Sequence, residues 1–239
     1  MKIQAMILIG GLGTRLAALF PDRPKALVPV GERVFLDRQL EWLAGCGVSS
    51  VHLAAGHSAG RLREWLAKAS LPMPVTISVE PAPLGTGGGL SFAASYIHAD
   101  PFLALNGDSL LPQLDLPGML VAHRRSGAAV TMSVAPVTDS GRYGLVDFDD
   151  DDRIIRAFRE KAAASAGWVN GGVYLINRSV LADLPSAPPP FSLERDVFPD
   201  LVKDSRIQAW PTPPPLLDMG TPDGLQAMTD YFLSADCAG

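Results

Sequence analysis

A continuous apolar run, Ile3–Ile9, leads directly into the glycine-rich stretch Gly10-Gly11-Leu12-Gly13. An apolar run without alternation is typical of a strand buried on both faces, and such strands belong to parallel sheets covered by helices. Glycines at the end of a strand leave backbone N–H groups open to an anion. Two cations follow, Arg15 and Lys25, ten residues apart. That spacing allows one loop to bring both cations to a single phosphate chain.

Strand-like and helix-like segments alternate through the first half of the chain. The strand patterns cover residues 3–9, 51–55, 75–79 and 102–105, and the helical patterns cover residues 35–44, 58–69 and 88–96. This β-α order predicts an α/β fold: a Rossmann-like, mixed but mostly parallel sheet flanked by helices. Ligands of such sheets bind beyond the carboxyl ends of the strands, where Gly10, Glu80 and Asp108 fall.

The regular alternation of strand and helix patterns ends in the second half of the chain. Strand patterns at 128–135, 145–148 and 168–176 are followed by two proline-rich connections, a helix from Ser192 and a final helix from Pro222 to about residue 232. The third of these strands is interrupted at Asn170-Gly171-Gly172. We find no internal repeat, so one domain with an insertion in its second half is the simplest interpretation.

A run of four aspartates, residues 149–152, raises the question of a calcium loop. The run lacks the central glycine and the distal glutamate that a calcium loop needs. A solvated turn is therefore favoured.

Charge and hydropathy exclude several classes of protein. The net charge of −5 argues against a general nucleic-acid-binding surface. Any anion site must therefore be a local concentration of Lys and Arg. No apolar run reaches the roughly 18 residues of a membrane span, and no charged segment precedes a cleavable apolar stretch. The two cysteines, Cys46 and Cys237, lie far apart, which suits a reducing compartment. We expect a cytoplasmic protein without membrane or nucleic-acid partners.

Three functional interpretations of the glycine-rich stretch compete with a plain strand-to-helix turn whose cations are solvated. A dinucleotide fingerprint needs a third glycine where Leu16 stands, and a P-loop needs Gly-Lys-Ser/Thr where Thr14-Arg15 stands. In the third interpretation, loop amides and Arg15 hold the β- and γ-phosphates of a nucleotide, and Lys25 lies near the α-phosphate.

The sequence Gly-Gly-Leu-Gly-Thr-Arg-Leu followed by Pro-Lys resembles the signature of the sugar-nucleotide pyrophosphorylases, the nucleotidyltransferases that make NDP-sugars. Further blocks match in the family's order: Glu80 to Gly88, Asn106-Gly107-Asp108, Arg142-Tyr143-Gly144, Phe158-Arg159-Glu160-Lys161, Asn170-Gly171-Gly172 and Asp218-Met219-Gly220-Thr221-Pro222. The combination is most similar to the D-glycero-D-manno-heptose 1-phosphate guanylyltransferases, followed by the mannose-1-phosphate enzymes. Two positions depart from the pattern: Ile9, where a small residue is common, and Ala162, where proline is common.

The resemblance implies in-line attack of a sugar 1-phosphate on the α-phosphorus of an NTP, with pyrophosphate as the leaving group. The implied catalytic residues are Arg15, Lys25 and Asp108, and the implied Mg²⁺ ligands are Asp108 and Asp218. Carboxylates at the mouth of a parallel sheet suit Mg²⁺, and such a transfer needs no protein nucleophile.

The resemblance also divides the chain. A nucleotide-binding half, residues 1–115, would use Leu8, Gly10, Gly11, Gly13, Thr14, Glu80, Gly85, Thr86 and Asn106. A sugar-phosphate-binding half, residues 116–239, would use Gly144, Glu160, Lys161, Asn170 and Gly171. Glu80 would accept hydrogen bonds from guanine N1–H and N2–H₂, which favours GTP. A homo-oligomer is left open.

Two rival functions follow from the same blocks. A regulatory subunit that binds nucleotide-sugar without turnover would tend to lose the cations and the metal aspartates, which are all present in this sequence. A uridylyl- or cytidylyltransferase for another phosphate would share the loop, but the Glu160-Lys161 and Asn170-Gly171-Gly172 blocks speak against it.

Overall fold

The computed structural model describes residues 3–11, 16, 19–21, 23–56, 59–141, 143–159, 165–185 and 189–236. Its central feature is a parallel group of four strands: β1 (Ile3–Ile9), β4 (Val48–Ala55), β5 (Val75–Val79) and β6 (Phe102–Asn106). β1 pairs with β4 and β6, and β4 pairs with β5, each time in parallel. The predicted parallel half of the sheet is confirmed.

The same sheet continues into the second half of the chain through antiparallel pairing. β11 (Gly167–Ile176) runs antiparallel to β6 and makes the connection. Beyond β11 lie the remaining strands: β8 (Val130–Val137), β9 (Leu145–Phe148), β10 (Ile155–Arg159) and β12 (Ile207–Pro211). The result is one mixed, mostly parallel sheet of nine strands, as the β-α order indicated.

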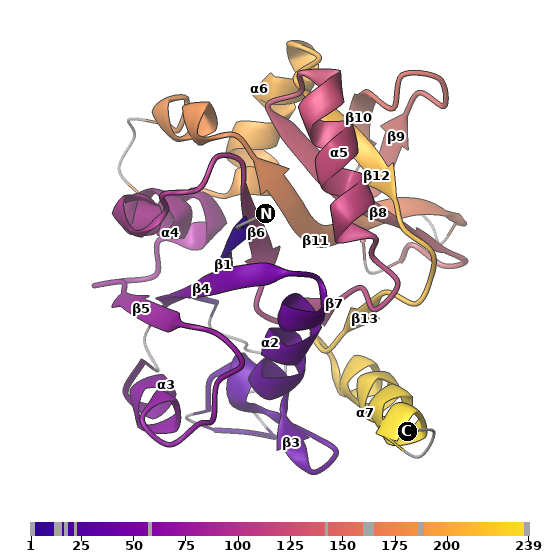
Figure 1. The fold of residues 1–239 in the computed structure, drawn as a ribbon. Coiled ribbons are helices and arrows are strands. Elements are labelled where there is room, and N and C mark those ends of the chain that lie inside the picture. Colours follow the sequence, from indigo (N-terminus) through magenta and orange to yellow (C-terminus); the bar gives the residue numbers. More distant parts are fainter. Residues whose placement is uncertain are drawn as a thin grey trace.

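Helices cover both faces of this sheet (Figure 1). One face packs against α2 (Phe35–Gly45), α3 (Ala59–Leu66) and α5 (Leu116–Ser126), and the other against α4 (Gly85–Ala93) and α6 (Phe198–Lys203). The short elements are η1 (Lys25–Leu27), β2 (Pro29–Val30), β3 (Arg33–Val34), η2 (Ala94–Tyr96), β7 (Ser109–Leu110), η3 (Arg178–Ala182), η4 (Leu193–Val197) and β13 (Leu217–Asp218).

Strand alternation divides the core between the two faces. In β1, Ala5 and Ile7 pack with α2 and α3, whereas Met6 packs with α4. Successive side chains of a strand point to opposite faces, so a strand covered on both sides must be apolar at every position. The unbroken apolar run of β1 is thus explained by its central place in the sheet.

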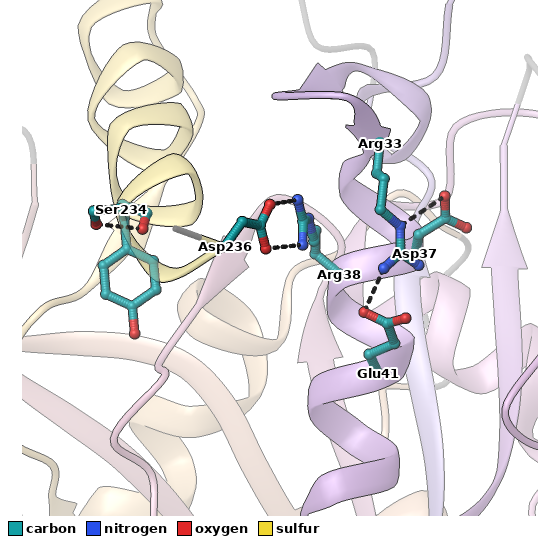
Figure 2. A network of polar contacts seen from close by, with 7 residues as sticks. Arg33, Asp37, Arg38, Glu41, Ser234 and Asp236 are labelled. Carbon is teal, nitrogen blue, oxygen red and sulfur yellow. Dashed lines mark hydrogen bonds and ion pairs between the residues drawn. The ribbon is translucent and has the colours of Figure 1, made fainter. Parts of the chain in front are cut away.

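The last helix, α7 (Pro222–Asp236), lies beside α2 (Figures 1 and 2). Its Met228 and Phe232 pack into a small third cluster together with Phe35 of α2. The Arg38 guanidinium lies 4.9 Å from the centre of the Phe232 ring and binds both carboxylate oxygens of Asp236. The end of the chain is therefore fastened to a helix of the first half.

Several elements differ from those predicted. In place of the predicted helix 88–96, the structure has α4, which begins at Gly85, followed by the 3-10 turn η2. The final helix continues to Asp236 rather than ending at residue 232. α5 and β12 were not predicted. Leu116-Pro117-Gly118 looks like a turn, but Asp115 caps the helix by accepting from Gly118 N at 2.9 Å. Ser58, which the sequence offers as the N-cap of the predicted helix 58–69, lies outside the described residues.

The four-aspartate run forms a turn, as predicted. Asp149 Oδ1 accepts hydrogen bonds from the backbone N–H groups of Asp151 and Asp152, and Arg156 forms ion pairs with Asp149 and Asp152. In the part of the chain that the structure describes, no helix has the length and apolar character to cross a membrane.

Candidate functional site

The Lys25–Asp108 ion pair lies at the carboxyl end of β6. The strand ends at Asn106, and Gly107 N donates to Leu8 O at 3.0 Å, which ties this turn to β1. Lys25 Nζ then donates to Asp108 Oδ2 at 2.8 Å. The two side chains are 22% and 32% exposed, so each remains accessible to a ligand. Two residues predicted to be catalytic thus lie in direct contact.

Asp218 is brought beside Asp108 by backbone pairing. β13 pairs antiparallel with β7, with Asp218 opposite Ser109, and Met219 N donates to Asp108 O at 3.1 Å. The Asp218 carboxylate accepts from Gly220 N at 2.7 Å and from the Tyr143 hydroxyl at 2.8 Å. The backbones of two aspartates that are distant in sequence therefore lie next to each other.

A cavity of about 180 Å³ lies at this edge. Six residues predicted for the nucleotide site or for catalysis line it: Leu8, Gly11, Lys25, Thr86, Asn106 and Asp108. Ile9 and Gly107 complete the lining. The structure thus gathers most of the described nucleotide-site residues around one space.

Glu80 is not among the residues that line this cavity. Its side chain is buried, accepts from Leu84 N at 3.2 Å and lies against Gly10, where a Cβ atom would be 2.9 Å from both carboxylate oxygens. Burial raises the pKa of the Glu80 carboxyl, and the hydrogen bond from Leu84 partly opposes that shift. A Cβ atom at position 10 would force the Glu80 carboxylate to shift, so Gly10 lets this side chain keep its place. Recognition of the base by Glu80 stays a prediction.

Gly85 is positioned by a close approach between two segments. Its φ is +77°, and a Cβ atom would lie 2.4 Å from Phe191 O. Only glycine adopts this backbone conformation without strain and leaves that space open. The Gly85-Thr86 turn therefore packs directly against the segment that leads into η4.

A second cavity, of about 720 Å³, lies in the second half of the chain. Of the residues predicted to bind sugar phosphate, Gly144 and Asn170 line it. Gly171 instead faces the interior, where a Cβ atom would lie 2.6 Å from Leu111 Cδ1. The other lining residues are Leu145, Val146, Phe158, Arg159, Glu194, Arg195 and Pro199.

Glu194 was missed by sequence reasoning. It follows the proline-rich connection as part of η4, a single turn of π-helix that Ser192 caps. Glu194 Oε2 accepts from the Thr86 hydroxyl at 2.7 Å, so it joins the two cavities. No local pattern in the sequence marks such a contact, because Thr86 and Glu194 come together only through the tertiary fold.

Gln39 was also missed. It is fully buried, and its amide donates to Asn106 O at 2.9 Å and to Ser109 O at 3.2 Å, on either side of Asp108. Gln39 thereby holds the turn that carries the carboxylate. A signal did exist in the sequence: Gln39 stands on the apolar stripe of α2 with Leu36, Leu40 and Leu43, where a polar residue needs buried partners.

Five predicted site residues lie outside the described residues: Gly13, Thr14, Arg15, Glu160 and Lys161. Among the described residues, no group of three or more His, Cys, Asp or Glu side chains could hold a metal. Mg²⁺, however, is commonly held by one or two carboxylates together with substrate phosphates. Asp108 lines the cavity and Asp218 stands on the strand that pairs with β7, so these two carboxylates fit that donor set.

Comparisons with known proteins agree with this geometry. The curated mannose-1-phosphate guanyltransferase of Schizosaccharomyces pombe is 33% identical over 239 residues, which is 98% of this chain and 65% of that protein's length. The D-glycero-alpha-D-manno-heptose 1-phosphate guanylyltransferase of Campylobacter jejuni is 29% identical over 96% of this chain and 97% of its own length.

A solved structure, HddC from Yersinia pseudotuberculosis complexed with GMP-PN, matches with a TM-score of 0.83 and 29% identity, covering 96% of this chain and 99% of the other. The nucleotidyl transferase family profile matches residues 4–231. The chain therefore belongs to the nucleotidyl transferase family.

Proposed function

We propose that this protein transfers a guanylyl group from GTP to a heptose or mannose 1-phosphate, giving a GDP-sugar and pyrophosphate. A phosphate oxygen of the sugar 1-phosphate forms a bond to the α-phosphorus. The bond from the α-phosphorus to the bridging α,β-oxygen breaks, and pyrophosphate leaves with the electron pair. The observation that carries the proposal is the Lys25–Asp108 pair, next to Asp218, at the edge of a cavity that the glycine-rich turn lines.

Each described residue has a role that its position supports. Lys25 supplies positive charge where the α-phosphate would lie, and its contact with Asp108 holds the ammonium at the cavity edge until substrate enters. Gly11 lines the same cavity, where a backbone N–H would suit the phosphate chain. Arg15 would complete the cationic side, and Glu160 and Lys161 would hold the sugar and its phosphate, with Gly144 and Asn170 lining the sugar cavity.

Mg²⁺ is part of the proposal. Asp108 and Asp218 would hold it, and when bound it supplies charge neutralisation of the phosphates. GTP is favoured because the relatives named above are guanylyltransferases and the Yersinia pseudotuberculosis structure contains GMP-PN. Glu80 remains the candidate for contact with the base.

A substrate matrix tests the proposal. The four NTPs are combined with mannose, glucose and heptose 1-phosphates, with and without Mg²⁺, and pyrophosphate release is measured. We expect release to be fastest with GTP and a manno-configured sugar, and to require Mg²⁺. Absence of release from every combination would leave the regulatory, non-catalytic alternative as the better description.

Substitutions at the ion pair test the roles of its members. Lys25→Ala and Asp108→Asn should each lower kcat/KM by roughly 10²–10³-fold, the usual cost of removing a group that stabilises charge in the transition state. Lys203→Ala is the matched control, because that lysine pairs with Asp200 on the exposed surface. An undiminished rate in Lys25→Ala contradicts the role of the ammonium.

A further inference from the structure

Thr86 and Asn170 belong to different cavities, yet a continuous chain of hydrogen bonds connects them. Thr86 lines the nucleotide cavity and donates to Glu194 Oε2 at 2.7 Å. Tyr174 donates to Glu194 Oε1 at 3.0 Å and accepts from Asn170 Nδ2 at 2.8 Å. Asn170 lines the sugar cavity. Two side chains that the proposed function leaves without a role, Glu194 and Tyr174, therefore form the bridge.

Donor and acceptor chemistry sets the direction of every bond in this chain. The Thr86 hydroxyl accepts from Leu193 N at 2.9 Å, so its own proton is available to Glu194. A carboxylate only accepts, so the Tyr174 proton must also point toward Glu194. The Tyr174 oxygen then accepts from the Asn170 amide, whose Oδ1 accepts from Gly172 N at 2.8 Å. The amide of Asn170 is thus held in one orientation.

Tyr174 is the buried centre of this series of hydrogen bonds, whereas Thr86, Asn170 and Glu194 are half-buried. Tyr174 is fully buried in β11, and burial together with the nearby Glu194 carboxylate raises the pKa of its phenol, which stays a donor. Glu194 stands on η4, and single π-helical turns are frequently associated with functional sites. Glu194 Oε2 also accepts from the Ser192 hydroxyl at 2.7 Å, so a shift of Thr86 changes the geometry of a shared acceptor and is passed to the other hydrogen bonds of Glu194.

We propose that Tyr174 and Glu194 are positioning residues that couple the nucleotide cavity to the sugar cavity. The inference depends on the proposed function, because it assigns the two cavities to the two substrates. A nucleotide bound against Thr86 holds the Thr86 hydroxyl in its hydrogen bond to Glu194. Glu194 in turn holds Tyr174, and Tyr174 holds the Asn170 amide in the orientation that receives the sugar. By linkage, bound sugar 1-phosphate strengthens nucleotide binding by the same factor.

A double-mutant cycle between Thr86→Val and Tyr174→Phe tests the coupling. Tyr174→Phe removes one hydroxyl and should raise KM for the sugar 1-phosphate about tenfold, with little change in KM for GTP. Thr86→Val should raise both KM values. If the two residues are coupled, the increase in sugar KM of the double variant should be smaller than the product of the two single-variant increases, by a factor of about three or more. Independent, multiplicative effects overturn the proposal.

Three further variants separate positioning from a loss of folding. Thr86→Ser keeps the hydroxyl and should restore the sugar KM. Glu194→Gln keeps the size of the side chain and should behave as Tyr174→Phe does at an unchanged Tm. Tyr96→Phe, at a partly exposed tyrosine of η2, is the matched control and should match the wild type. A normal sugar KM in both Tyr174→Phe and Glu194→Gln contradicts the coupling.

A second measurement does not require turnover. GTP alone should slow amide hydrogen exchange in residues 168–172 of the wild type but not of Tyr174→Phe. Equal slowing in both proteins, or none in the wild type, overturns the coupling. A third outcome separates the two proposals. If GTP slows exchange in the wild type but not in Tyr174→Phe, and no substrate pair releases pyrophosphate, the proposed function is overturned and the coupling between the cavities is supported.

Discussion

His52 is a buried histidine in the middle of the parallel sheet, and it has no part in the candidate site. Its Nδ1 lies 2.8 Å from the Thr76 hydroxyl and its Nε2 lies 2.9 Å from the Ser78 hydroxyl, both on β5. The ring stacks on Tyr96 with the centroids 4.3 Å apart. Burial lowers the pKa of the imidazole from 6.5 to about 4. The folded protein therefore holds His52 neutral at a pH where the unfolded chain binds a proton.

This difference predicts a loss of stability in weak acid. Between pH 6.5 and 4 the unfolded state binds more protons at His52 than the folded state, so the free energy of unfolding falls as the pH falls. From pH 7 to pH 5 the contribution is about 2 kcal/mol. Urea titrations at both pH values measure it. His52→Gln should reduce the pH dependence by that amount, whereas His98→Gln, at an exposed histidine, should not.

Among individual residues, those that stand in short sequence motifs could be identified from the sequence, and those that depend on tertiary contacts could not. Asp108, Lys25 and Asp218 each stand in a short block that the family resemblance marks. The structure places Lys25 against Asp108 and pairs the strand of Asp218 with β7, and the roles of the three residues stay predictions. Glu194 and Tyr174 could not be identified from the sequence, because their importance comes from contacts with Thr86 and Asn170 that no local pattern encodes.

At the scale of elements, the attachment of α7 depends on Arg38. This side chain is only 8% exposed, and its guanidinium lies over the Phe232 ring. The same guanidinium binds the Asp236 carboxylate (Figure 2). Arg38→Ala should lower the free energy of unfolding by about 2 kcal/mol, mainly through lost packing, and should speed hydrogen exchange in α7.

Arg33→Ala provides the control for this substitution. Arg33 also stands beside α2, but it is 39% exposed and pairs with the exposed Glu41. Surface pairs of this kind contribute little, so its effect should stay within about 0.5 kcal/mol. Equal destabilisation by both substitutions would mean that Arg38 does not fasten α7.

Elements were predicted well where a single periodicity dominates. The apolar runs of β1 and β6 and the helical stripe of α2 identified those segments. α5 and β12 were missed because proline and glycine at their ends look like turns, whereas Pro117 lies in the first turn of α5 and Pro211 ends β12. Caps and sheet partners, which decide such cases, are tertiary features.

At the scale of the whole molecule, we propose that the halves 1–115 and 116–239 unfold together. β6 pairs with β11 across the boundary, and Phe102 and Leu103 of β6 share core clusters with β11. A single sheet that spans both halves predicts one cooperative transition. Urea unfolding followed by tryptophan fluorescence and by far-UV circular dichroism should give coincident curves. Two separated transitions would show that the halves fold independently.

The short pairing of β7 with β13 has a consequence for synthesis of the protein. Asp108 emerges from the ribosome well before Asp218, and the two-residue ladder between β7 and β13 brings their backbones together. A nascent or clipped chain that ends before β13 can form the parallel strands yet holds half of the carboxylate pair. Under the proposed function, a chain that ends before β13 lacks one of the two Mg²⁺ carboxylates, and we expect it to consume no nucleotide.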